Sequence, residues 1–217
     1  MYIKTIYISS TLIFTMEFIM VQEYFNENEK IRGNSVIHHK KLNGVDVTEM
    51  EDLIADIKED SKIANFTFRA SNDWLNGANS LTRLDSFYGA GKEWEHEETF
   101  SVEADEPKVM LGSDKAPSPG ELVLSALSSC LATSIAYHGA AKEIKIDSIS
   151  GEYEGDVDLQ GFLGLSTTVN KGFKEINVSL KVKTSADESI VEELVKMSPV
   201  YEMLTNPVKV NLDIQTF

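Results

Sequence analysis

The strongest constraint on the fold of this chain is a helix-start pattern followed by a long apolar segment. Ser118 can cap a helix, Pro119 suits a first helical position, and Glu121 stands three residues after the serine, which completes a capping box. Small or apolar residues then surround almost the whole circumference of a helix over 122–141. The sequence therefore predicts a helix over 119–141 that is buried on most sides.

Other segments have the spacing of strands or of amphipathic helices. The strand-like runs are 66–69, 81–88, 98–104, 148–158, 175–184 and 208–214. Two segments place apolar residues at helical spacing behind a cap. They are 48–60, where Thr48 and Glu51 form a capping box, and 187–197; Ser198-Pro199 then restarts a short turn of helix. Because the first three strands follow one another directly, they favour an antiparallel meander, and the whole pattern predicts an α+β fold.

Charge and cysteine content exclude several functions. The 217 residues include 20 basic and 35 acidic side chains, a formal charge of −15. Such a surface repels nucleic acid and anionic membranes, so neither is an expected partner. The single cysteine, Cys130, excludes an intrachain disulfide and a zinc site built on several thiolates. One thiol is compatible with a reducing compartment, and we expect a cytoplasmic protein.

The first twenty residues resemble an export signal only in part. Lys4 precedes an apolar run at 6–14, but no small-x-small cleavage site follows. With Lys4 and Glu17 inside it, the segment is too short and too interrupted to span a bilayer. Three interpretations stay open: translation that begins at Met16 or Met20, a cleaved export signal, or an ordered strand.

Residues 21–43 are polar and are predicted to form a solvated arm. His38 and His39 are adjacent and have no carboxylate or cysteine at ligand spacing, so we interpret them as a surface pair and expect no metal site. With the helix predicted at 48–60, residues 1–61 form an N-terminal extension, and residues 62–217 form the main domain.

Four separated motifs point to a known family. They are Asp105-Glu106-Pro107, Pro117-Ser118-Pro119-Gly120-Glu121-Leu122, Ala126-Leu127-Ser128-Ser129-Cys130, and Ser198-Pro199-Val200-Tyr201 with Leu204-Thr205-Asn206-Pro207. In this order they resemble the OsmC and organic-hydroperoxide-resistance superfamily over residues 62–217. The resemblance implies mainly antiparallel sheets wrapped around two central helices in an intertwined homodimer, with active sites at the dimer interface.

The resemblance also implies roles for particular residues. Cys130 occupies the position of the peroxidatic thiol, which attacks an organic hydroperoxide. The second, resolving cysteine of the better-studied members is replaced by Ser198. Because a hydroxyl cannot form the disulfide, turnover would need an external thiol reductant.

The groups that activate the thiol depart from the family pattern. Family enzymes use an arginine and a glutamate that directly follows the proline of the helix-start motif, but that position is Gly120 and Glu121 lies one residue later. Glu121 is then either a catalytic partner or a plain capping residue. Arg69 and Arg83 are the candidate arginines, acting across the dimer interface, or they are surface strand residues.

The chemistry of Cys130 leaves two functions open. It lies about 16 Å along the helix from Pro119, beyond the reach of the helix dipole, and burial alone would raise the pKa of its thiol. One hypothesis is a one-cysteine organic hydroperoxide reductase without cofactor, in oxidative stress defence. The alternative is a non-catalytic dimer that binds a small apolar molecule.

The glycine-rich segment 155–165 is either a lid over a ligand pocket or a dimer connection.

Overall fold

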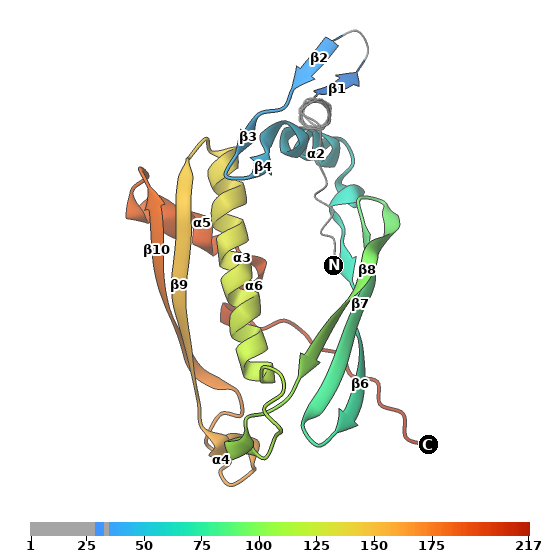
Figure 1. Cartoon of the computed structure of the whole chain (residues 1–217), viewed down its shortest axis with the longest axis vertical. Helices are drawn as coiled ribbons and strands as arrows, with labels where there is room; N and C mark the ends of the chain where they lie inside the picture. The colour runs from blue at the N-terminus through green and yellow to red at the C-terminus, as the bar shows by residue number, and fades with distance from the viewer. Residues whose placement is uncertain (1–28, 33–34) are drawn as a thin grey trace, which may run out of the picture.

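The computed structural model describes residues 29–32 and 35–217 of the chain. The three interpretations of the first twenty residues, and the first part of the predicted arm, lie outside the described residues. The centre of the molecule is the helix α3 (Pro119–Ala141), which has the predicted bounds and the predicted capping box. Figure 1 shows an antiparallel hairpin close beside α3 and a separate sheet that extends away on its other side.

The separate sheet is the predicted meander. It consists of β5 (Thr67–Phe68), β6 (Ser71–Asn76), β7 (Asn79–Gly89) and β8 (Lys92–Ala104). Strand β7 pairs antiparallel with β5 and β6 along one edge and with β8 along the other. The turn between β6 and β7 contains Gly77 at φ 58°, a conformation that glycine adopts without steric cost. A short 3-10 helix, η1 (Ser61–Ala64), precedes this sheet.

The hairpin beside α3 confirms the second predicted pair of strands. It consists of β9 (Ile146–Val157) and β10 (Phe173–Thr184), which pair antiparallel along their whole length. Ile176, Leu180 and Val182 of β10 are partly buried, whereas the lysines between them are exposed. One face of the hairpin is therefore packed and the other faces water, as the alternation predicts.

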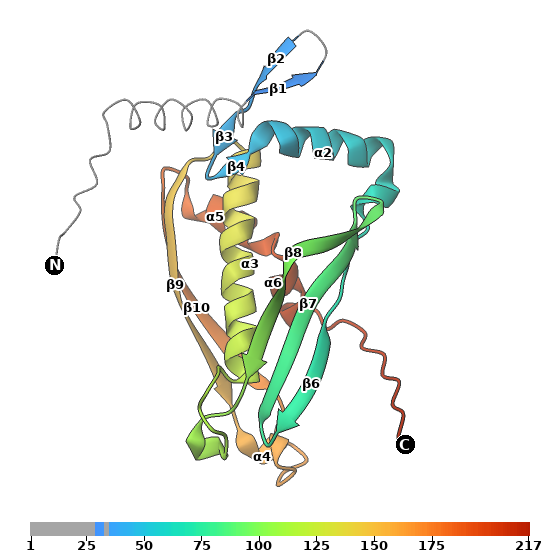
Figure 2. The same ribbon diagram turned by 45° about the vertical axis from the view of Figure 1, so that its right-hand side comes forward.

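Two short helices complete the core on one side of α3. They are α5 (Glu188–Lys196) and α6 (Pro199–Thr205), and both pack against α3 (Figures 1 and 2). The largest fully buried apolar side chains are Leu131, Ile135 and Leu194. The core therefore lies between α3, α5 and α6.

The N-terminal extension differs from the predicted solvated arm. Residues 29–46 form two small hairpins, β1 (Glu29–Arg32) with β2 (Ser35–His38), and β3 (Lys41–Leu42) with β4 (Val45–Asp46). Helix α2 (Val47–Glu59) follows, and its N-cap is Asp46 instead of the predicted Thr48. The reason is that the hydroxyl of Thr48 accepts a hydrogen bond from the backbone N–H of Lys40, whereas Asp46 accepts the N–H of Glu49.

The predicted strand at 208–214 is wrong for the single chain. None of the described residues after Thr205 belongs to a helix or strand, and the apolar side chains of this tail are exposed. The alternating pattern is real, but a strand needs a hydrogen-bonding neighbour, and the tail pairs with no strand of the described chain.

The burial expected for α3 is also only partly met. Its buried residues are Leu127, Leu131, Ser134, Ile135, Gly139 and Ala140. Val123 and Tyr137 are exposed, so α3 is not buried on all sides in the single chain. Among the described residues, α3 is the one helix long and apolar enough to cross a bilayer, a property that core helices of soluble proteins share.

Candidate functional site

Cys130 lies near the middle of α3 and is half-buried. In the part of the chain that the structure describes, its thiol has no hydrogen-bond or ion-pair partner. The following residue, Leu131, is 1% exposed and belongs to the core. The thiol therefore lies at the boundary between the packed and the exposed sides of α3, where a small molecule can approach it.

Ser198 is fully buried and caps helix α6. Its hydroxyl oxygen accepts a hydrogen bond of 3.2 Å from the backbone N–H of Tyr201. Pro199 stands at the first position of the helix, so the local sequence encodes this start as it does that of α3. The position that resembles a second cysteine thus has a structural role in this chain.

The two candidate arginines lie in or beside the β5–β8 sheet and are paired with carboxylates. Arg69 makes two hydrogen bonds to Glu93, of 2.8 and 3.0 Å, and Arg83 makes one of 2.5 Å to Asp73. The hydrogen bonds that Arg69 donates to the Glu93 carboxylate raise the pKa of Arg69 above its ordinary value. Neither guanidinium contacts Cys130 through a hydrogen bond within the described chain.

Glu121 completes the capping box of α3. One carboxylate oxygen accepts the backbone N–H of Ser118 at 2.7 Å and its hydroxyl at 2.8 Å. The backbone hydrogen bond, followed by the hydroxyl, lowers the pKa of Glu121. The carboxylate is therefore held at the helix start, about two and a half turns from Cys130.

A groove of about 580 Å³ lies at the N-terminal end of α3. It is lined mainly by apolar residues from the start of α3, the ends of β9 and β10, and the short helix α4 (Leu159–Phe162). The glycine-rich segment noted in the sequence contributes Gly155, Val157 and Phe162 to its wall. The segment therefore lines a pocket in the single chain, and the lid and the dimer connection both stay predictions.

The loop at the mouth of this groove is held by a buried aspartate that sequence reasoning did not single out. Asp105 is 1% exposed and accepts the backbone N–H groups of Glu106 at 2.8 Å, Ser113 at 3.1 Å and Lys115 at 3.3 Å. The bond from Glu106 is the main cause that lowers the pKa of this carboxyl. A Cβ at position 112 would lie 1.8 Å from the carbonyl oxygen of Glu106, so only Gly112 fits the turn.

Glu106 and Gly120 determine the chemistry of the groove. One carboxylate oxygen of Glu106 is buried and has no hydrogen-bond partner among the described residues. Gly120, the position of the family glutamate, faces the ring of Phe173, since an added Cβ would lie 3.3 Å from the ring. The groove therefore combines apolar walls with one unpaired carboxylate oxygen.

A second cavity of about 570 Å³ lies between β10, α5 and α3. Its apolar lining includes Leu131, Val178, Leu180, Val191 and Val195. Leu131 directly follows the cysteine, so this cavity borders the same stretch of α3. The single chain thus places apolar space on α3 near both its start and its middle.

Comparison with known proteins gives one family match. Residues 112–213 match the family model described as "OsmC-like protein". No curated protein matches the chain. These residues include the helix with Cys130, the hairpin β9–β10, and the helices α5 and α6.

Several solved structures share parts of this arrangement at low identity. An OsmC-like protein from Mycoplasma pneumoniae is 16% identical, covers 65% of this chain and 89% of its own, and gives a TM-score of 0.48. An organic hydroperoxide resistance protein from Legionella pneumophila is 17% identical, with coverages of 64% and 90% and a TM-score of 0.42. A protein of Vibrio cholerae, described as a possible hydroperoxide resistance protein with captopril bound in one active site, is 16% identical, with coverages of 64% and 85% and a TM-score of 0.39.

The matched residues include the capped helix, the cysteine segment and the second Ser-Pro helix start, in the order in which the sequence presents them. The mixed α+β architecture with antiparallel sheets agrees with that assignment. Residues 112–213, just under half of the chain, are therefore similar to the OsmC-like family.

Proposed function

We propose that this chain is a cytoplasmic organic hydroperoxide reductase that uses Cys130 and an external thiol. The observation that carries the proposal is the half-buried position of Cys130 in the family helix, next to apolar space that suits an organic substrate. The Cys130 thiolate attacks the terminal peroxide oxygen, the O–O bond breaks, and the alcohol leaves with a proton. Cys130 becomes a sulfenic acid.

The reduction half uses a thiol from solution. A first external thiol condenses with the sulfenic acid, releasing water and forming a mixed disulfide. A second external thiol attacks this disulfide, so Cys130 returns as a thiol and the two reductant sulfurs leave joined. An external thiol is required because Cys130 is the only cysteine of the chain.

The proposed active form is a homodimer. Exposed apolar side chains support it: Val123 and Tyr137 of α3, and Phe68, Trp74 and Phe100 of the β5–β8 sheet. Apolar surfaces of this extent on a soluble protein mark an interaction site. A partner sheet laid on α3 would also bring an Arg69 or Arg83 toward Cys130, where a cation would lower the pKa of the thiol.

The test is peroxide consumption by the whole chain, with cumene hydroperoxide as substrate and dithiothreitol as reductant. We expect turnover that Cys130→Ser abolishes, together with a mass increase of about 16 on the Cys130 peptide, one oxygen, when the reductant is omitted. Oxidation of Cys130 no faster than that of a free thiol would contradict the proposal. Light scattering on the same sample measures the oligomeric state.

The second candidate function is a dimer that binds a small apolar molecule without turnover. It is favoured by the ion pairs that occupy Arg69 and Arg83, which leave both guanidinium groups engaged in the single chain. The two candidate functions are distinguished by the fluorescence of the apolar probe anilinonaphthalene sulfonate. The probe is added to the Cys130→Ser variant, which lacks the thiol. Saturable probe binding that is lost in Val123→Asp, with no peroxide consumption by the unmodified chain, would favour binding alone.

A further inference from the structure

The loop that precedes α3 contains two neighbouring carboxylates with opposite surroundings. The carboxylate of Asp105 is buried and accepts the backbone N–H groups of three residues. The next side chain, Glu106, is half-buried, and neither of its carboxylate oxygens has a hydrogen-bond or ion-pair partner in the described part of the chain. One of these oxygens is fully buried. The single chain therefore satisfies the first carboxylate and leaves the second unpaired.

An unpaired carboxylate at this depth is costly, and the backbone holds it there. A carboxylate that loses water without gaining a donor is destabilised, and a charged donor beside it recovers this loss. The backbone N–H of Glu106 donates to Asp105 at 2.8 Å, and its carbonyl oxygen accepts the N–H of Asp114 at 3.1 Å. Pro107 follows and restricts the conformation of Glu106 further. The loop thus fixes the point from which the Glu106 side chain extends.

Glu106 lines both cavities at this end of the molecule. One is the groove of about 580 Å³ at the start of α3, and the other is a cavity of about 540 Å³ that includes the β6–β7 turn. The two cavities share Met110, Pro119 and Phe162 as well as Glu106, so they adjoin. Both volumes lie in the range of small-molecule sites, and both walls are mainly apolar. A molecule with an apolar body suits this space.

The charges around the groove select the polar end of such a molecule. The charged side chains that line it are Glu106, Glu121 and Lys171. The carboxylate of Glu121 is already held by the capping box of α3. Lys171 is exposed, so its ammonium group is solvated by water. The charge that lacks both water and a partner is that of Glu106, and a positively charged hydrogen-bond donor complements it.

We propose that this groove binds a small organic ammonium ion, a protonated amine with an apolar or aromatic body. The ammonium group donates to the carboxylate of Glu106, and the body packs against the apolar wall that includes the rings of Phe162 and Phe173. The site is separate from the proposed peroxide chemistry, because Cys130 lines neither of the two cavities.

The test is calorimetric titration of the full chain, kept reduced and free of peroxide, with phenethylamine, which is protonated at neutral pH. We expect one saturable site. Phenethyl alcohol has the same body with a neutral hydroxyl and should bind at least about tenfold more weakly. Glu106→Gln should weaken binding of the amine at least about tenfold and change that of the alcohol less than about threefold. Equal affinities for the two ligands, or amine binding that is unchanged in Glu106→Gln, would overturn the proposal.

Glu98→Gln is the matched control, since it removes the same charge from an exposed glutamate of β8 that does not line the groove. It should leave the affinity for the amine within about twofold. Phe162→Ala removes apolar wall instead of charge, so it should weaken the amine and the alcohol by a similar factor. Phenethylamine should also raise the midpoint of thermal unfolding in the control but not in Glu106→Gln.

A second copy of the chain is the alternative occupant of this carboxylate, because it could bring an arginine to Glu106. The chain would then show no saturable binding of phenethylamine. Glu106→Gln would instead raise the dimer dissociation constant in a dilution series followed by light scattering. Either result would overturn the proposal.

Discussion

The side-chain oxygen of Asn43 accepts a hydrogen bond of 2.8 Å from the backbone N–H of Ile146, 103 positions further along the chain. The amide nitrogen of the same side chain donates to the carbonyl oxygens of Ile144, at 2.9 Å, and Ala136, at 3.3 Å. Asn43 therefore joins the β3–β4 turn to the end of α3 and the start of β9. Gly139 permits the approach, because a Cβ there would lie 3.2 Å from the Asn43 amide nitrogen.

Asn43→Ala should destabilise the chain by about 1–3 kcal/mol. The substitution removes all three hydrogen bonds and leaves partly buried backbone groups unpaired. Asn43 also has φ 55°, a left-handed conformation that alanine tolerates less well than asparagine. Urea unfolding followed by circular dichroism measures the change in the free energy of unfolding.

Asn177→Ala is the control for this experiment. Asn177 is exposed on β10, and its side chain has no hydrogen-bond partner in the described chain. Its substitution should change the free energy of unfolding by less than about 0.5 kcal/mol. Equal effects of the two substitutions would mean that Asn43 does not anchor the extension.

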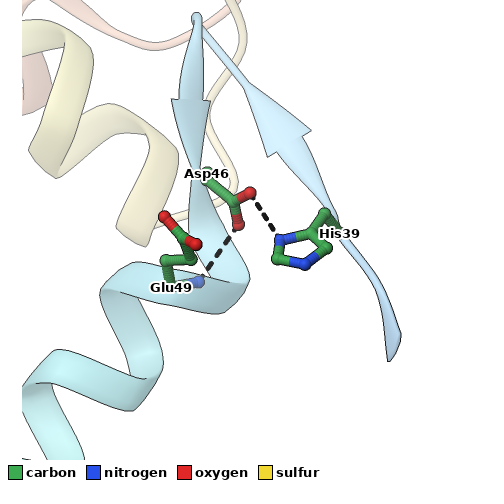
Figure 3. A group of neighbouring side chains, drawn as sticks. All are labelled: His39, Asp46 and Glu49. Atoms are coloured by element: carbon green, nitrogen blue, oxygen red, sulfur yellow. Dashed lines mark hydrogen bonds and ion pairs between the residues drawn. The ribbon is translucent and has the colours of Figure 1, made fainter. Parts of the chain in front are cut away.

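This anchor illustrates which features could be predicted from the sequence. The capped start of α3 at Ser118 and Pro119, and the alternation along β10, depend on a few neighbouring residues, and both predictions are confirmed. The contacts of Asn43, and that of His39 with Asp46, depend on how distant segments close on one another. No local pattern encodes them, so the irregular arm predicted for 21–43 was wrong where the structure describes it, and His39 is packed and not on the surface as predicted (Figure 3).

The candidate site shows the same division. Cys130 could be placed on its helix from the sequence, and so could the caps formed by Glu121 and Ser198. The groove at the start of α3 could not, because it is formed by β9, β10, α4 and the loop that Asp105 holds. The arrangement of Arg69 and Arg83 around Cys130 stays a prediction, since it requires a second chain.

Asp105 should make part of the stability depend on pH. Hydrogen bonds from backbone N–H groups, that of Glu106 first, lower its folded pKa below the value in the unfolded chain. Its contribution is therefore complete above the unfolded value of about 3.9 and is lost as pH falls through the lower folded pKa. Asp105→Asn should destabilise the chain at pH 7 and less so near pH 3, by urea unfolding at each pH.

The matched control is Asp114→Asn, an exposed aspartate in the same loop. The two variants lose the same charge, so any difference between them reports the buried hydrogen bonds. If Asp105→Asn is as stable as the control at pH 7, the loop at the groove is not held by this carboxylate.

Ser198→Cys tests the family geometry around the thiol. If position 198 of α6 faces Cys130, a peroxide-generated sulfenic acid should be trapped as an intrachain disulfide, with loss of one water. Non-reducing electrophoresis and mass spectrometry detect this species. The substitution also removes the cap of α6, so we expect a destabilisation of about 1 kcal/mol before oxidation.

Ser198→Ala separates the two effects, because it removes the cap without adding a thiol. It should show the same loss of stability and no disulfide. Persistent sulfenic acid in Ser198→Cys, without any disulfide, would show that the two side chains do not meet.

The exposed C-terminal tail gives the last prediction, which rests on the proposed dimer. Val208, Val210, Leu212 and Ile214 alternate with polar residues, and all four are at least 58% exposed in the single chain. A strand of this pattern buries one apolar face when it pairs with a neighbouring sheet. Leu212→Asp should raise the dimer dissociation constant at least about tenfold, since burying one leucine contributes about 1.5–3 kcal/mol. Asn211→Asp adds the same charge on the opposite face and should leave dimerisation nearly unchanged. Light scattering over a dilution series measures both, and equal weakening would mean that charge, and not burial of the apolar face, controls association.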